Sequence, residues 1–369
     1  MPIKKRKVVR KKKQASLRAI DLFCGCGGLT QGLKKVGFKV VGAVDNEPLA
    51  IAAYKANHKE VDVWEADIRN IDPAKKKREL ALKKGELELL AGCPPCQGFS
   101  TLRTANGAYD VYDERNDLLH QFYLFADAFL PKAVMLENVP RLAETHRFKL
   151  FLARMRKLGY VGEHKILDAA NYGVPQRRRR LIYIAGHRSA IPFAKPSKRF
   201  KSVRSAIGAL PRAGSSGDPL HDLPEKRSSR ILRLIKKIPK NGGSRTELPK
   251  KYVLPCHKEH EGYYDVYGRM HWDEVSPTIT SGCFNPSRGR FLHPTRNRAI
   301  TMREAALLQG FSKGYRFPAP HSKTAIALMI GNALPPPFIA AHARTIRSQV
   351  SVTSRKSRVV QRNQPTRRK

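Results

Sequence analysis

One short segment combines residue types and spacing that could perform thiol chemistry. Cys93 and Cys96 lie in the turn GCPPCQGFS, which follows the apolar run 86–92 directly. A C-x-x-C spacing is typical of a redox pair, but no clear helical pattern follows this turn. Residues 101–115 are instead polar and contain glycine, which is typical of a mobile loop. A redox pair is therefore disfavoured, and both thiols stay available for other chemistry.

The other cysteines predict neither a disulfide framework nor a metal site. Zinc is usually held by two closely spaced pairs of ligands. Cys256, His257 and His260 lie close together, but Cys283 is distant, so we expect no metal site. The six cysteines are expected to be thiols in a reducing compartment: Cys24, Cys26, Cys93, Cys96, Cys256 and Cys283.

A glycine-rich turn near the start of the chain indicates a ligand site. The sequence DLFCGCGG begins at Asp21, between an apolar strand pattern and a helical pattern. Glycines let a ligand approach the backbone, and a helix N-terminus favours negative charge. Thr30 stands where a dinucleotide fingerprint has its third glycine, which disfavours NAD and favours a nucleoside cofactor without pyrophosphate. A tight structural turn is the alternative.

Two carboxylates lie where they could contact such a cofactor. Asp45 ends the next strand pattern, 20 residues after Gly25, and could bind the two hydroxyls of a ribose. Asp67 follows another short apolar stretch and could accept a hydrogen bond from an adenine amino group. For Asp67 alone, a helix cap is the alternative.

Hydrophobic periodicity predicts the elements that must position these residues. Strands are expected at 17–23, 39–45, 86–92, 132–139 and 179–187, and helices at 29–38, 116–130, 146–160, 301–311 and 335–350. Repeated strand–turn–helix–strand units predict an α/β class with a doubly wound, Rossmann-like sheet.

Composition predicts a division of the chain into two domains and two arms. We expect a basic disordered arm at 1–16, the first part of the larger domain at 17–187, a smaller irregular domain at 188–295, a returning part of the larger domain at 296–350, and a basic disordered tail at 351–369. The smaller domain is rich in Gly, Pro, Ser, Lys and Arg and has weak periodicity.

The charge of the chain predicts a polyanionic partner. Lys and Arg number 71 against 30 Asp and Glu, which gives a net charge of +41. Nucleic acid is the usual partner of so basic a protein, although a ribosomal type of protein would share this composition. Eight of residues 1–13 and seven of residues 355–369 are basic, so both arms are expected to contact phosphate without recognising sequence.

Six motifs, in matching order, resemble the C5-cytosine DNA methyltransferase family over roughly residues 17–350. They are DLFxGxGG at Asp21, PPCQGFS at Pro94, ENV at Glu137, QRRRR at Gln176, REAAxLQGF at Arg303 and GNALPP at Gly331. Cys24 departs from the small Ala or Ser that is usual at its position. The resemblance implies a DNA (cytosine-5-)-methyltransferase (EC 2.1.1.37) that transfers a methyl group from S-adenosyl-L-methionine to a cytosine in a specific duplex sequence.

The resemblance also implies which residues carry the reaction. Cys96 resembles the family nucleophile, whose thiolate adds to C6 of a flipped cytosine, and Cys93 would be a bystander. Glu137 would act at N3, Arg180 at the O2 side of the base, and Arg178 would support the thiol and its loop. Taken alone, Glu137 is better explained as a strand-end carboxylate paired with an arginine, and the arginine run is more often a solvated or phosphate-binding face.

The cofactor residues implied by the resemblance come from several motifs. Phe23 would stack on adenine, Asp45 would bind the ribose and Asp67 the adenine amino group. The other expected cofactor-binding residues are Gly25, Gly27, Gly28, Asn46, Ile68 and Asn332. Residues 188–295 would then be a target-recognition domain, and the 101–115 loop would close over the flipped base.

Other functions and partners follow from the same features. An RNA methyltransferase with this catalytic core and an inactive basic DNA-binding protein are the alternatives, and an NAD enzyme is a poor third. The expected partners are double-stranded DNA and, as a candidate, a restriction endonuclease acting on the same site. No apolar run predicts a membrane segment or signal peptide. We expect a monomer in the bacterial cytoplasm, at the nucleoid, with a nuclear location as the alternative because of the basic N-terminal run.

Overall fold

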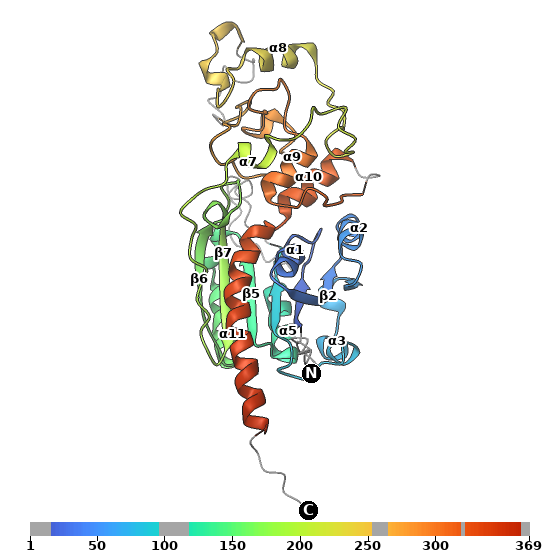
Figure 1. Cartoon of the computed structure of the whole chain (residues 1–369), viewed down its shortest axis with the longest axis vertical. Helices are drawn as coiled ribbons and strands as arrows, with labels where there is room; N and C mark the ends of the chain where they lie inside the picture. Colours follow the sequence, from blue (N-terminus) through green and yellow to red (C-terminus); the bar gives the residue numbers. More distant parts are fainter. Residues whose placement is uncertain (1–15, 96–117, 253–264, 319–321, 363–369) are drawn as a thin grey trace, which may run out of the picture.

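The computed structural model describes residues 16–95, 118–252, 265–318 and 322–362. A larger lobe is built on a seven-stranded sheet, and a smaller lobe of loops and short helices lies at one end of it (Figure 1). The strands are β1 Leu17–Leu22, β2 Phe38–Asp45, β3 Asp62–Glu65, β4 Leu89–Gly92, β5 Ala133–Asn138, β6 Tyr160–Asp168 and β7 Arg179–His187.

The strand order β3-β2-β1-β4-β5-β7-β6 confirms the doubly wound α/β fold. The first five strands of this order pair in parallel, and β7 runs antiparallel to both β5 and β6. The order reverses direction between β1 and β4, so the carboxyl ends of these two strands flank a crevice. An antiparallel β7 also brings its beginning, rather than its end, to this edge of the sheet.

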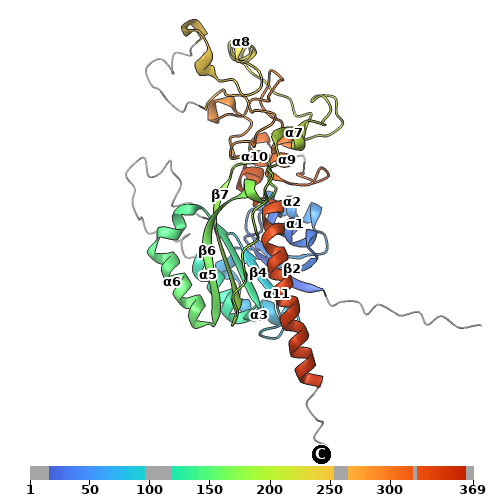
Figure 2. The same ribbon diagram turned by 60° about the vertical axis from the view of Figure 1, so that its left-hand side comes forward.

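Helices cover both faces of the sheet, as Figure 2 shows for α6 and α11. The α-helices are α1 Gly28–Lys35, α2 Pro48–Asn57, α3 Pro73–Glu79, α5 Leu118–Phe129, α6 His146–Lys157, α7 Val203–Ile207, α8 Ser229–Lys237, α9 Met302–Gln309, α10 Lys323–Asn332 and α11 Pro336–Arg362. Short 3₁₀ turns are η1 Ile68–Asn70, η4 Pro140–Glu144, η5 Ala169–Tyr172, η6 Arg245–Glu247, η7 Lys250–Tyr252 and η9 Pro286–Arg288.

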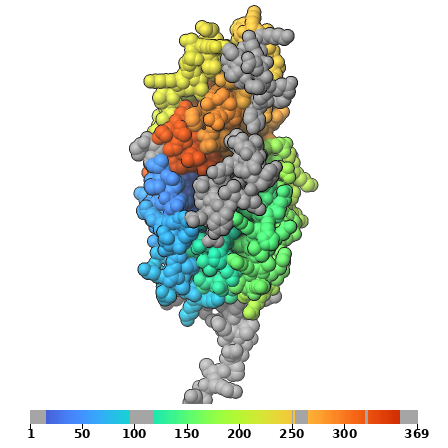
Figure 3. All heavy atoms as spheres, turned by 180° about the vertical axis from the view of Figure 1, so that it is seen from behind, coloured from blue at the N-terminus to red at the C-terminus, as the bar shows by residue number. Residues whose placement is uncertain are grey.

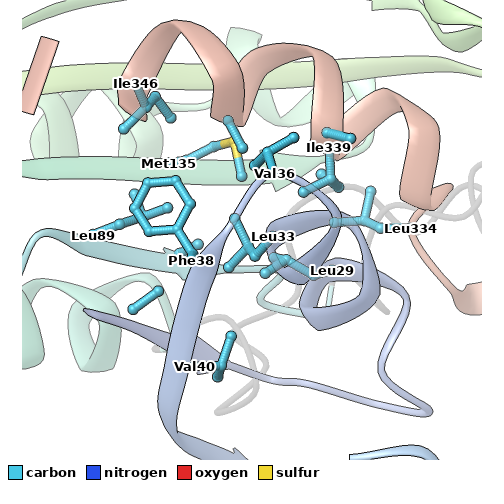
Figure 4. Close-up of a cluster of buried hydrophobic side chains, with 14 of the residues drawn as sticks. Leu29, Leu33, Val36, Phe38, Val40, Leu89, Met135, Leu334, Ile339 and Ile346 are labelled. Carbon is cyan, nitrogen blue, oxygen red and sulfur yellow. The ribbon is translucent and has the colours of Figure 1, made fainter. Parts of the chain in front are cut away.

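The period of two along each strand divides the core between the faces. On β5, Ala133 and Met135 join the cluster under α1 and α11, whereas Val134 and Leu136 join the cluster under α5 and α6. Figure 4 shows the first cluster, where Leu33 of α1 and Ile339 of α11 meet above the sheet. Both faces are thus buried, as a parallel sheet requires.

Close packing of α1 against α11 depends on glycine. A Cβ on Gly28 would collide with the Leu334 carbonyl oxygen, and one on Gly32 would lie 2.7 Å from the Ile339 Cβ. Gly28 therefore serves the approach of these two helices, in addition to any role at a ligand.

In the smaller lobe, a buried arginine joins several loops beside two hydrophobic clusters. The Arg269 side chain is 0% exposed and donates to the carbonyl oxygens of Ile235 and Ile238, at the end of α8, and to that of His293. These bonds satisfy carbonyls that the end of a helix leaves unpaired. Burial lowers the pKa of Arg269 to about 10, so it stays charged at neutral pH.

Two helices that follow the predicted boundary at 295 pack with the smaller lobe. α9 and α10 pack into one cluster with Val203, Ile207 and Met270 of the smaller lobe, and the chain rejoins the sheet core only at Leu334. Figure 3 shows the yellow and orange lobe seated on the blue and green sheet domain. The domain limits at 187 and 295 remain sequence predictions. In the structure, the core of the smaller lobe also includes α9 and α10, which follow residue 295.

Helix α11 continues to Arg362, past the predicted start of the tail at 351, and the disorder of residues 351–369 stays a prediction. No proline or glycine follows Pro337 within the helix to end it earlier. The arm 1–16 lies outside the described residues except for Ser16.

One stretch could cross a membrane by length and composition. It is Lys323–Ser351, which comprises α10 and the first part of α11, with a break in the helix at 333–335. Of its most apolar window, 61% is buried inside the fold. This burial is typical of core helices.

Candidate active site

The register of the central strands brings two predicted catalytic residues, Glu137 and Arg180, together with Cys93, which was expected to be a bystander. Gly92 pairs with Leu136, so Cys93 and Glu137, the next residues of two parallel strands, lie side by side. On β7, Arg180 lies on the same face as Ile182, which pairs with Glu137. Alternation along each strand therefore points Cys93, Glu137 and Arg180 toward the α11 face of the sheet.

Glu137 has both of its oxygens in contact with donors. The Arg180 Nε lies 3.0 Å from Oε1, and the Cys93 thiol donates to Oε2 with an Sγ–O distance of 3.0 Å. The Glu137 residue is only 8% exposed. Desolvation, followed by the Glu137 charge, raises the pKa of Cys93 well above its usual value, so this cysteine is a protonated thiol at neutral pH.

The ENV motif also holds the cysteine turn in place. The Asn138 Nδ2 donates to the Pro94 carbonyl oxygen at 2.9 Å, and its Oδ1 accepts from the Val139 backbone N–H at 2.8 Å. This anchor lies two residues before Cys96. Cys96 itself, and the predicted lid 101–115, lie outside the described residues.

Arg178 does not touch Glu137; it joins the two lobes. Its guanidinium donates to the carbonyl oxygens of Ile279 at 3.3 Å and Gly331 at 2.9 Å, in two segments that pack against each other. Burial, followed by the charge of Arg180, lowers the pKa of Arg178 to about 9. The residue is therefore a charged brace at the junction beneath the site.

Gln176 forms the second brace, which the motif comparison did not single out as functional. It is fully buried, donates to the Gln309 Oε1 at 2.6 Å and accepts from the Ile279 backbone N–H at 2.8 Å. The QRRRR and REAAxLQGF motifs therefore meet in space. Gln309 is a polar residue that directly follows the apolar run 305–308, and this is the sequence signal for such a contact.

Five predicted cofactor residues line one cleft beside this site. The cleft is bounded by Phe23, Val44, Asp45, Asn46, Ala66, Asp67, Ile68, Arg69, Pro95 and Leu118. It joins the ends of β1, β2 and β3 to the cysteine turn, because Pro95 directly precedes Cys96. Aromatic and aliphatic walls with two carboxylates fit a purine nucleoside: a flat ring and hydroxyls or amino groups that donate.

The glycine turn contacts Asp45, which lines this cleft. The Gly25 N–H donates to Asp45 Oδ2 at 2.8 Å, and a Cβ on Gly25 would meet nothing within 4 Å. Phe23 has φ of 60°, an unusual backbone conformation for a bulky residue, which directs its ring into the cleft. Desolvation raises the pKa of Asp45, and its contact with Gly25 opposes that rise.

Gly27, Asp67 and Asn332 need separate description. A Cβ on Gly27 would collide with Tyr315 and His58, so Gly27 serves packing. Asp67 lines the cleft and also caps η1, where it accepts from the backbone and side chain of Arg69. Asn332 is exposed at the end of α10 and does not line the cleft among the described residues.

A buried polar cluster under the turn was missed by the sequence analysis. Asp21 is 0% exposed and accepts from Thr30 Oγ1 at 2.7 Å, and Thr30 also contacts the Tyr54 hydroxyl at 2.7 Å. Among the described residues, the second oxygen, Oδ1, has no hydrogen-bond partner. Burial raises the pKa of Asp21 from 3.8 to about 7.

The remaining cysteines support no further site. Cys24, Cys26 and Cys283 are buried free thiols, and burial raises the pKa of each. Cys256, His257 and His260 lie outside the described residues. Within the described ranges, no three His, Cys, Asp or Glu side chains come together as metal ligands.

Comparisons with known proteins identify the family of this chain. The model of the family "C-5 cytosine-specific DNA methylase" matches residues 17–348. A type II methylase of Herpetosiphon aurantiacus, M.HgiDII, is 35% identical over 86% of this chain and 91% of its own length. A type II methyltransferase of Haemophilus parahaemolyticus, M1.HphI, is 31% identical over 90% of this chain and 87% of its own length.

Solved structures share the fold. A prophage-encoded E. coli protein, described as a DNA modification methyltransferase, superposes with a TM-score of 0.67 at 24% identity, over 91% of this chain and all of its own. A DNMT2 mutant from Spodoptera frugiperda gives a TM-score of 0.58 at 18% identity, over 90% of this chain and all of its own.

Proposed function

Because the chain belongs to the C-5 cytosine-specific DNA methylase family, it is a DNA (cytosine-5-)-methyltransferase, and we propose that Cys96, Glu137 and Arg180 carry its reaction on a flipped cytosine. The observation that supports this most is the contact of Arg180 with Glu137, beside the anchored turn that ends at Cys96. A stacked base exposes neither face of C6, so the cytosine must leave the helix first.

Each proposed residue has one task on the base. The Cys96 thiolate adds to C6, which forms a C–S bond and makes C5 nucleophilic. Glu137 holds a proton at N3, where negative charge would otherwise develop, and Arg180 orients Glu137 and faces the O2 side. After C5 is methylated, its proton leaves to water, the C–S bond breaks and the thiolate departs.

We assign the cleft at Phe23 and Asp45 to S-adenosyl-L-methionine, which supplies an electrophilic methyl group when bound. Phe23 and Ile68 would flank the adenine, Asp45 with Asn46 would face the ribose, and Asp67 would accept from the amino group. Because Asp67 already binds Arg69, its contribution should be smaller than that of the ring contacts. Gly25 would leave room for the ligand, whereas Gly27 and Gly28 allow close packing against Tyr315 and Leu334. The assignment of Asn332 to the edge of this site rests only on the GNALPP motif.

The smaller lobe is proposed to recognise the DNA sequence. Its helix α8 presents Arg230, Arg233, Lys236 and Lys237 to solvent and buries Leu234 and Ile235. Such a helix can contact phosphates, and neighbouring loops can reach base edges.

Trapping on modified DNA tests the nucleophile. Duplex DNA with 5-fluorocytosine at the methylated position should bind the wild-type enzyme covalently, since fluorine cannot leave C5 as a proton does. Cys96→Ser should bind DNA and transfer essentially no methyl group, and Cys93→Ser should still be trapped. Trapping lost in Cys93→Ser and kept in Cys96→Ser would reject the assignment. Bisulfite sequencing of DNA from expressing cells identifies the target sequence.

Binding of S-adenosylhomocysteine tests the cleft without turnover. Phe23→Ala should weaken binding at least about five-fold, because an aromatic–base stack is worth roughly 1–3 kcal/mol. Phe200→Ala is the control, since that ring is 54% exposed and lies outside the cleft. Equal affinity of both variants would reject the assignment of this cleft.

A further inference from the structure

The hydrogen bond from the Cys93 thiol to Glu137 has no part in the reaction proposed above. Cys93 ends the parallel pairing of β4 with β5, and its Sγ donates to Glu137 Oε2 at 3.0 Å. On the opposite side, Arg180 Nε contacts Oε1 at 3.0 Å. The carboxyl group is therefore held at both oxygens, by donors from the two neighbouring strands.

We propose that Cys93 is a positioning residue for Glu137: its S–H bond to Oε2, together with Arg180 at Oε1, fixes the plane of the carboxyl group for contact with the base. This inference rests on the proposed role of Glu137. It replaces the expectation that Cys93 is a bystander in the turn.

Three features of the surroundings support a donor at this position. Burial and the Glu137 charge raise the pKa of Cys93 well above its usual value, so the thiol keeps the proton that it donates. The backbone at Cys93 is fixed, because its N–H donates to the Leu22 carbonyl oxygen at 3.2 Å and Gly92 packs too closely on Leu22 for any side chain. On the far side, Asn138 holds Pro94. With the backbone fixed, rotation about the Cα–Cβ bond is the freedom left to Sγ, and its hydrogen bond to Oε2 holds one rotamer.

The contact leaves the carboxyl group able to act as an acid. Each carboxyl oxygen has two lone-pair positions, and the thiol and the guanidinium each occupy one of them. A proton can therefore reside on Glu137 while both contacts persist. Without the thiol, Arg180 alone would hold one oxygen, and the carboxyl group could rotate about that contact.

Substitutions at Cys93 separate a donor from a space-filling residue. Cys93→Ala should lower kcat about three- to ten-fold, the change that corresponds to one ordinary hydrogen bond, with little change in KM for DNA. Cys93→Ser offers a hydroxyl donor in the same place and should restore most of kcat. Thermal unfolding of each variant checks that the fold is kept.

The S–H stretching band gives a readout that does not depend on turnover. The difference between wild-type and Cys93→Ala infrared spectra isolates the Cys93 band. Glu137→Gln should move that band to higher wavenumber, because an amide oxygen accepts more weakly than a carboxylate. An unmoved band, or a Cys93→Ala enzyme with wild-type kcat, would overturn the inference. Wild-type turnover of Glu137→Gln would reject the role of Glu137 itself, which is a separate result.

Discussion

Replacing Asp21 by asparagine should change how the stability of the enzyme depends on pH. The folded protein holds the Asp21 proton more tightly than the unfolded chain, since burial raises its pKa from 3.8 to about 7. The stability contribution of this group is therefore complete below pH about 4 and is lost as the pH rises toward 7. At about 1.4 kcal/mol per pH unit, the full loss is about 4 kcal/mol.

Asp21→Asn removes the ionisation and keeps the shape. The amide oxygen can still accept from Thr30, and the amide nitrogen takes the place of Oδ1, which has no partner now. The cost of burying that nitrogen does not depend on pH. The free energy of unfolding of the variant, relative to wild type, should therefore rise by about 2 kcal/mol between pH 5.5 and 8.

Urea denaturation at pH 5.5 and pH 8 measures this difference. Buried histidines such as His58 and His342 also have shifted pKa values, but they titrate alike in both proteins and cancel. Asp127→Asn is the control, because its side chain is 46% exposed and should give a flat difference. A flat difference for Asp21→Asn as well would refute the reasoning about Asp21.

Three further outcomes are expected. Glu137→Gln should still flip the base, as measured with a fluorescent base analogue. Its rate in a methyl-transfer assay should fall about 10²–10⁴-fold, and near-normal turnover would contradict the role of Glu137. Gly28→Ala should lower the free energy of unfolding by about 1–3 kcal/mol, because its Cβ meets the Leu334 carbonyl, while Gly314→Ala in open space should not. Deleting both basic arms should weaken binding equally for cognate and unrelated duplexes and flatten its salt dependence, with the methylated site unchanged; equal affinity of the truncated and full chains would show that the arms do not bind DNA.

The central part of the fold could be predicted from sequence because its strands are buried on both faces. The strands at 17–23, 39–45, 132–139 and 179–187 are continuous apolar runs, and the structure confirms them. Strand β6 was missed because it lies at the edge of the sheet, where residues 161–166 are exposed and carry no alternation. Helix α10 was missed because its apolar residues are distributed around the helix, so the helical period is weak.

The site was predicted in part for a similar reason. Residues such as Phe23, Asp45 and Asp67 follow strand ends, so their meeting in one cleft follows from the doubly wound topology. The contact of Cys93 with Glu137 depends on the register of two strands 44 residues apart, which a motif does not specify. The contacts of Arg178 could not be predicted from the motif either, since its partners at 279 and 331 belong to the other lobe.

The path of the chain between the lobes determines where chimeric enzymes can be joined. Residues 188–202 leave β7 at the far end of the sheet and return along it: Ala194 binds His342 of α11, and Ser197 binds Asn171 of η5. This strap therefore belongs to the sheet domain, although it follows the last strand. The other crossing point is at Leu334, after α9 and α10. A graft of a relative's recognition lobe should keep the host strap, begin near residue 202 and end near 333. It must also preserve the packing across the junction, because α9 and α10 share a core cluster with Cys26, Ala50 and Ala53 of the sheet domain.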